Sequence, residues 1–239
     1  MRDRTLLVGS LTVIAAASGF GLLGPLARFA YDAGLDPISF VAWRAAFGTL
    51  IVAVFAAWMI RRGRAFVAPW HLPAGPRAAL LVACVTALVL NVGMFFAFSL
   101  TTVAIALLAF YTYPAFVALV EIARGHERLD AIRAAALALS LGGMVLVVAG
   151  GLGAAGEVRV DPLGIGLALV AASAQTVFIL ISRHGYSALP AEQAMTWIIG
   201  STMIACALLA IAGAGAGTGA LTVPLTEPRA LGLAAVAGT

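Results

Sequence analysis

Arg44 is a permanent charge inside an almost wholly apolar run, residues 37–60, where a charge is least expected. If the N-terminus is cytoplasmic, Arg44 lies about 10 Å from the outer end of a spanning helix. It then either faces a central cavity, where it attracts a substrate carboxylate or organises an extracellular gate, or it snorkels to the outer headgroups or pairs with a neighbouring helix. The outer-side carboxylates available to pair with it are Asp32, Asp36 and Glu157.

Two acids are candidates for gating or coupling. Glu121 lies inside an apolar run, seven residues after Pro114 and hence near the same helix face. A carboxylate there suits proton coupling; the alternative is an interfacial acid that pairs with Arg124 or another inner arginine. Glu127 is expected at the start of the next helix, where a negative charge suits the helix N-terminus. We interpret Glu127 as a structural or gating residue, not as a ligand.

A cluster of aromatic residues and a proline lies in the middle of another apolar run, at Tyr111, Tyr113 and Pro114. Proline removes one helical hydrogen bond and opens a kink. Irregular backbone inside a membrane is tolerated beside cavities, so these rings are candidates to stack on a substrate. The alternative is simple packing around the kink.

Three polar residues at mid-span positions complete the candidate cavity: Ser18, Asn91 and Gln175. Each can contact substrate or form a hydrogen bond between helices. The sequence contains no zinc-protease, serine-hydrolase, Walker A or dinucleotide signature, and its two cysteines have no metal-ligand spacing. We therefore expect a protein that is not an enzyme and needs no cofactor and no metal.

The composition predicts a membrane protein. The chain is 63% hydrophobic and only 10% charged, whereas a soluble domain has about a quarter charged residues. All 14 cations are arginines. They lie between apolar runs and form no basic face, so a nucleic-acid partner is not expected.

The apolar runs predict an all-α polytopic fold with seven complete spans. They lie near 5–27, 38–60, 78–98, 102–123, 133–151, 163–182 and 192–212, and an eighth starts near Arg229. With a cytoplasmic N-terminus, ten arginines fall inside and three outside, as the positive-inside rule requires. The inner arginines are Arg2, Arg4, Arg61, Arg62, Arg64, Arg77, Arg124, Arg128, Arg133 and Arg183, and the outer ones are Arg28, Arg159 and Arg229. We expect a multi-pass protein of the cell inner membrane.

Two further patterns concern the packing of the spans. Gly164, Ala168 and Ala172 form a face of small residues on span 6 that permits close helix contact. A shift of 155 residues aligns Arg28 with Arg183. Because span 1 runs outward and span 6 inward, two five-span units are inverted relative to each other.

The predicted units are residues 1–151 and 162–239. The second is short by about three helices at ~20 residues each, so a chain truncated at its C-terminus is expected.

The segment 101–150 resembles the EamA-type units of the drug/metabolite transporter superfamily. It has a small polar start, an apolar helix, Tyr113–Pro114, and Glu-Arg-Leu at 127–129. His126 stands where the family usually has glycine. The segment 29–50 is similar to the family's second helix, which commonly carries an arginine near the place of Arg44. The resemblance covers roughly 5–212 and implies ten helices in two inverted units, with export or exchange of small metabolites.

These observations favour a secondary transporter of small organic metabolites or drugs that works by alternating access. The alternatives are an inactive fragment that needs a partner to complete it, and a non-transport membrane enzyme or scaffold. The expected partners are the lipid bilayer and a small organic solute, with a homodimer as a further option.

Overall fold

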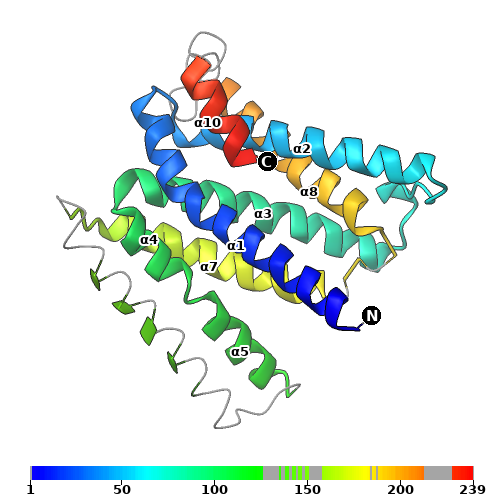
Figure 1. The fold of residues 1–239 in the computed structure, drawn as a ribbon, viewed down its shortest axis with the longest axis horizontal. Helices are drawn as coiled ribbons and strands as arrows, with labels where there is room; N and C mark the ends of the chain where they lie inside the picture. Colours follow the sequence, from blue (N-terminus) through cyan, green and yellow to red (C-terminus); the bar gives the residue numbers. More distant parts are fainter. Residues whose placement is uncertain are drawn as a thin grey trace.

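The protein is built from helices (Figure 1). The computed structural model describes residues 2–125, 158–183, 185–186, 188–212 and 228–238, with isolated residues between 135 and 150. The elements in these ranges are α1 (Arg2–Asp32), α2 (Pro37–Arg61), the 3-10 helix η1 (Pro69–His71), α3 (Ala74–Leu100), α4 (Val103–Phe110), α5 (Tyr113–Ala123), α7 (Pro162–Ser182), α8 (Ala191–Ile211) and α10 (Pro228–Gly238). No strand occurs in these ranges, which confirms the all-α prediction.

Five segments of the described chain are long and apolar enough to cross a membrane: Pro37–Arg61, Ala74–Leu100, Val103–Ala123, Pro162–Ser182 and Ala191–Ile211. They correspond to predicted spans 2, 3, 4, 6 and 7. Predicted span 1 lies within α1. Predicted span 5, at 133–151, falls largely outside the described residues, so the total number of spans stays a prediction.

Two helices begin at an aspartate followed by proline. Asp36 accepts hydrogen bonds from the Ile38 and Ser39 amides, both at 3.3 Å, at the start of α2. Asp161 accepts from the Leu163 amide at 2.7 Å at the start of α7. Such caps satisfy amides that the first helical turn leaves without a partner. Both carboxylates are thereby engaged at helix ends.

The fourth predicted span is broken in the middle. α4 ends at Phe110 and α5 begins at Tyr113, because Pro114 has no amide proton to continue the helical ladder. The Thr112 hydroxyl donates to the Ala109 carbonyl at 2.7 Å and so supports the break. The sequence places the kink correctly.

Small residues bring α3 and α7 close together. A Cβ atom on Gly164 of α7 would lie 3.0 Å from the Thr101 side chain, and one on Gly93 of α3 would lie 3.3 Å from the Leu167 carbonyl. Ala168 and Ala172, on the same face of α7, are fully buried. The predicted small-residue face is therefore a helix–helix contact. α2 packs mainly on α8, and α10 packs on α2 and α1.

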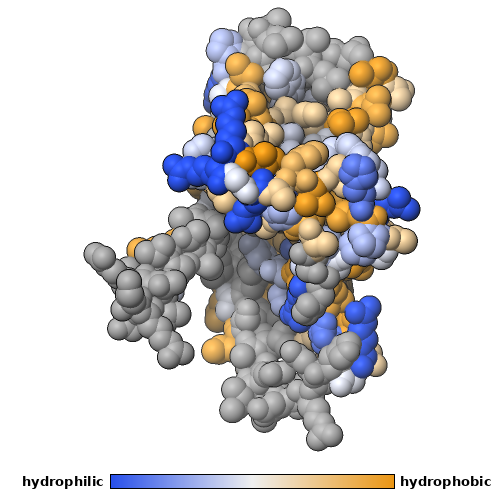
Figure 2. All heavy atoms as spheres, turned by 90° about the vertical axis from the view of Figure 1, so that its right-hand side faces the viewer, coloured by the Kyte–Doolittle hydropathy of each residue, from blue (hydrophilic) through white to orange (hydrophobic). Residues whose placement is uncertain are grey.

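The bundle has an arginine-rich end and an opposite end. The arginine-rich end holds the C-terminus of α2, the N-termini of α3 and α8, and residues 62–73 between them. Arg61, Arg62 and Arg64 are exposed there together with Phe66 and Trp70. Figure 2 looks onto this end and shows hydrophilic residues interspersed with hydrophobic ones. Arginine mixed with aromatic side chains is typical of a membrane–water interface.

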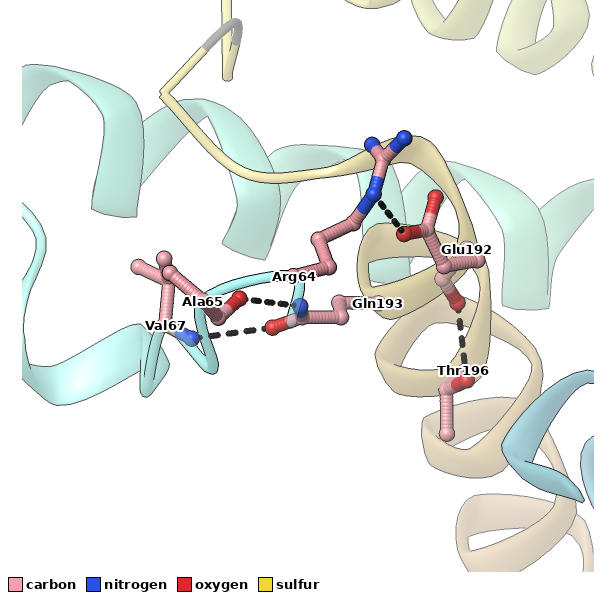
Figure 3. A network of polar contacts seen from close by, with 6 residues as sticks. All are labelled: Arg64, Ala65, Val67, Glu192, Gln193 and Thr196. Atoms are coloured by element: carbon pink, nitrogen blue, oxygen red, sulfur yellow. Dashed lines mark hydrogen bonds and ion pairs between the residues drawn. The ribbon is translucent and has the colours of Figure 1, made fainter. Parts of the chain in front are cut away.

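The segment after α2 is fastened onto α8 by one glutamine (Figure 3). The Gln193 side chain donates to the Ala65 carbonyl at 2.8 Å and accepts from the Val67 amide at 2.9 Å. Beside it, Arg64 and Glu192 form an ion pair at 3.3 Å. At the opposite end, the Thr101 hydroxyl donates to the Arg159 carbonyl at 2.7 Å, which ties the start of the α7 segment to the end of α3.

Candidate functional site

Arg44 and Asn91 meet in the interior of the bundle. The Arg44 guanidinium, on α2, donates a hydrogen bond to the Asn91 side-chain oxygen on α3. The Asn91 amide nitrogen donates in turn to the Ala87 carbonyl one helical turn away, at 2.8 Å, which orients the amide. The guanidinium also lies over the Phe95 ring, 5.3 Å from its centroid, in cation–π geometry. Neutral groups therefore hold this charge.

The Arg44 side chain keeps an unused donor. Its Nε is buried and has no hydrogen-bond partner among the residues that the structure describes. An arginine offers five N–H donors in a planar fork, and Asn91 accepts one of them. The guanidinium therefore has donors left for another acceptor.

The carboxylates whose side chains the structure describes are used elsewhere or lie in solvent. Asp36 and Asp161 cap helices. Glu192 pairs with Arg64, Glu121 lies 3.8 Å from Arg183, and Asp32 is exposed. The expectation that Asp36 or Asp32 pairs with Arg44 is therefore not met, because Asp36 faces its own helix N-terminus. Glu157 falls outside the described residues.

Two cavities flank the Arg44–Asn91 pair, and both are lined by Arg44, Leu90 and Asn91. The smaller cavity, ≈ 100 Å³, has walls of Met94, Phe98 and Leu107, which lie toward the end opposite the arginines. The larger one, ≈ 280 Å³, has walls from Ala87 and α8 and lies toward the arginine-rich end. The pair thus stands between two cavities that follow one another along α3.

The larger cavity combines apolar walls with a few polar groups. Its apolar residues include Leu90, Phe178, Ile198 and Ile199. Gln175 of α7 also lines it, and in the described part of the chain its amide makes no hydrogen bond. A volume of ≈ 280 Å³ holds on the order of ten waters, which matches a small organic solute. Apolar walls with a few convergent polar groups are typical of a ligand site.

Three of the predicted cavity residues therefore come together: Arg44, Asn91 and Gln175. The others lie apart from the two cavities. Ser18 of α1 is exposed on the surface of the described structure. Tyr111, Tyr113 and Pro114 sit at the α4–α5 break, where the Tyr113 ring packs on Phe110 at 5.3 Å between centroids. A contact of these residues with solute stays a prediction.

The two predicted coupling acids have different outcomes. Glu121 is buried in α5 and faces Arg183 at the end of α7. This agrees with the interpretation that it pairs with an inner arginine, although the partner comes from another helix and is not Arg124. Glu127 lies outside the described residues.

Sequence reasoning missed Phe95 and Gln193. Phe95 follows Asn91 by four positions, so the spacing alone puts both on one helix face and could have revealed it. Gln193 carried no such signal, because its two partners are backbone groups more than 120 residues earlier in the chain.

Apolar helices long enough to span a membrane, packed around an arginine–asparagine pair, define a multi-pass membrane protein with internal cavities. Residues 7–149, more than half of the chain, match the EamA-like transporter family. The chain belongs to this family, so it is a membrane transporter of the drug/metabolite type.

A solved structure described as "Crystal structure of protein" is 21% identical, with a TM-score of 0.61 over 92% of this chain and 76% of its own. That likeness concerns the fold. Among curated proteins no significant match was found.

Proposed function

We propose that the protein is a secondary transporter that moves small organic solutes across the inner membrane by alternating access. One observation carries the proposal: a hydrogen-bonded Arg44–Asn91 pair stands between two cavities inside a bundle of spanning helices. Alternating access requires a site near the midplane with a barrier on each side in turn. With the cytoplasmic N-terminus that the arginine distribution predicts, the larger cavity lies on the cytoplasmic side of the pair.

The pair works as an internal barrier in this proposal. Arg44 is fixed to α2 and Asn91 to α3, so a relative movement of these helices breaks their hydrogen bond. A solute that offers Arg44 a better acceptor than the Asn91 amide favours this separation. Binding energy is thereby coupled to opening, which is how a ligand shifts a two-state equilibrium.

We also propose that units 1–151 and 162–239 are inverted repeats. In that division α1, α2 and α3 correspond to α7, α8 and α10. The packing supports it, because the contacts between units come in equivalent pairs: α3 on α7 matches α10 on α1, and α2 on α10 matches α8 on α3. α2 and α8, which are equivalent helices of the two units, also pack directly on each other. Inverted repeats are a recurring plan of secondary transporters.

Counterflow in proteoliposomes tests the transport function. Vesicles that contain the protein are loaded with unlabelled solute and diluted into labelled solute, across a broad panel of amino acids, organic acids and drugs. We expect saturable uptake of at least one solute class. The Arg62→Gln variant should keep this exchange, because Arg62 lies over the Trp58 ring at the C-terminal end of α2 and lines neither cavity. Absence of saturable exchange across the whole panel contradicts the proposal.

A further inference from the structure

We infer that the transported solute is a small organic monoanion whose acidic group binds Arg44 and whose apolar body fills the larger cavity. This inference rests on the transport function proposed above and adds the chemical class of the substrate. It draws on the charge balance around Arg44, on its free donor and on the walls of the cavity.

No carboxylate pairs with Arg44 in the part of the chain that the structure describes. Each carboxylate whose side chain the structure describes is engaged at a helix end or in another ion pair, apart from the exposed Asp32. Arg44 has an amide oxygen and an aromatic ring as neighbours. A cation removed from water without a counter-ion is unstable, and a bound anion relieves that cost. A cationic solute would instead add a second uncompensated positive charge.

The N–H groups that Arg44 leaves unused indicate how an acidic group binds to its guanidinium. Within the described part of the chain the buried Nε of Arg44 has no partner, while a terminal nitrogen is bound to Asn91. Carboxylates and related oxyanions take two parallel N–H bonds from one guanidinium, which is stronger and more directional than a bond to a neutral amide. An acidic group therefore competes with Asn91 for the fork and is the acceptor able to displace it.

The walls define the rest of the molecule. Leu90, Phe178, Ile198 and Ile199 favour an apolar body, and the Gln175 amide is available for one further polar group. A volume of ≈ 280 Å³ limits the body to roughly the size of one aromatic ring with a short chain. A polyanion such as a nucleoside diphosphate does not fit this description, because a single arginine cannot balance several charges away from water.

A matched ligand panel tests the charge. The probes are 3-phenylpropane-1-sulfonate, its sulfonamide and (3-phenylpropyl)trimethylammonium, which share one apolar body and carry a negative, a neutral and a positive head. Calorimetry on the purified full chain should give at least ~10-fold tighter binding of the sulfonate than of either other probe, equivalent to about 1.4 kcal/mol. Chloride should bind more weakly than the sulfonate, because it has no apolar body. Equal binding of the three heads, or binding of none, overturns the inference.

The Asn91→Asp variant gives the sharpest test. It changes one amide to a carboxylate at the same size and supplies Arg44 with an internal counter-ion. We expect the thermal midpoint to stay the same or rise, while sulfonate affinity falls at least ~10-fold. Asn91→Ala is the matched control: it removes the amide without adding charge, and the preference for the anion should persist. Wild-type sulfonate affinity in a folded Asn91→Asp protein overturns the inference.

Variants of Arg44 keep the test decisive if Asn91→Asp does not fold. Arg44→Lys keeps the charge and should keep the preference for the anion, whereas Arg44→Gln should lose it. An Arg44→Gln protein that still prefers the sulfonate overturns the inference. Counterflow separates this result from a failure of the proposed function. If the protein exchanges neutral or cationic solutes but no anions, the proposed substrate class is wrong and transport stands. If it exchanges no solute of any class, the proposed transport function is wrong.

Discussion

Gln193 offers a test of how the membrane-embedded bundle is held at its arginine-rich end. The side chain is almost completely buried and makes two hydrogen bonds to the segment after α2, one to Ala65 and one to Val67 (Figure 3). In the Gln193→Leu variant the side chain keeps a similar volume but loses both hydrogen bonds. The carbonyl of the exposed Ala65 and the amide of the half-buried Val67 then have no partner from α8.

The size of the effect follows from these two groups. A buried polar group left without a partner costs about 1–3 kcal/mol. Two such groups, reduced for their partial access to water, give an expected loss of about 2–4 kcal/mol in the free energy of unfolding. For a chain of this length that corresponds to a fall of roughly 4–16 °C in the melting temperature.

Thermal melting of the purified protein in detergent, followed by intrinsic tryptophan fluorescence, measures this loss. Thr196→Val is the matched control, since it removes a hydroxyl that donates at 2.8 Å to the Glu192 carbonyl one turn earlier on the same helix. That carbonyl is free to keep its ordinary helical partner, so we expect a change below about 1 kcal/mol. The reasoning is refuted if Gln193→Leu melts within error of the wild type, or no lower than Thr196→Val.

Three further changes probe the packing and the cavity. Gly93→Val should lower stability by about 1–3 kcal/mol, because its side chain meets the Leu167 carbonyl of α7; melting no lower than that of Gly93→Ala contradicts the close contact. Ala87→Leu adds apolar volume to the larger cavity, so melting should be unchanged or higher while solute exchange falls at least ~10-fold; full exchange would place the solute path elsewhere. Thr101→Val removes the hydrogen bond from the Thr101 hydroxyl to the Arg159 carbonyl and should lower the free energy of unfolding by about 0.5–1.5 kcal/mol, measured by thermal melting. An unchanged melting temperature would contradict a stabilising role for this bond.

Sequence reasoning placed five predicted spans on observed helical segments because hydropathy is a local property. The predicted starts near 38 and 163 fall at the beginning of α2 and α7, and the break in the fourth span follows from Pro114. The small-residue face of α7 could also be predicted, because Gly164, Ala168 and Ala172 recur at helical spacing.

The site was predicted less completely, because hydropathy gives the depth of a residue but not the side of the helix that faces the cavity. Arg44, Asn91 and Gln175 face the bundle interior, whereas Ser18 has similar polarity and depth but is exposed. The partner of Arg44 depended on how α2 and α3 are rotated against each other. The partner of Glu121 depended likewise on α7, which begins some forty residues later in the chain.

Side-dependent labelling of a cysteine at position 175 tests alternating access most directly. In a variant with Cys84→Ala and Cys206→Ala, Gln175→Cys puts one thiol on the wall of the larger cavity. A membrane-impermeant alkylating reagent is applied to sealed vesicles from one side and then from the other. The reference is Leu119→Cys in the same background, which lies on the exposed surface of α5 within a spanning segment. The account predicts labelling from both sides, slowed on each by the transported solute, with Leu119→Cys unlabelled. Labelling of position 175 from one side alone would contradict it.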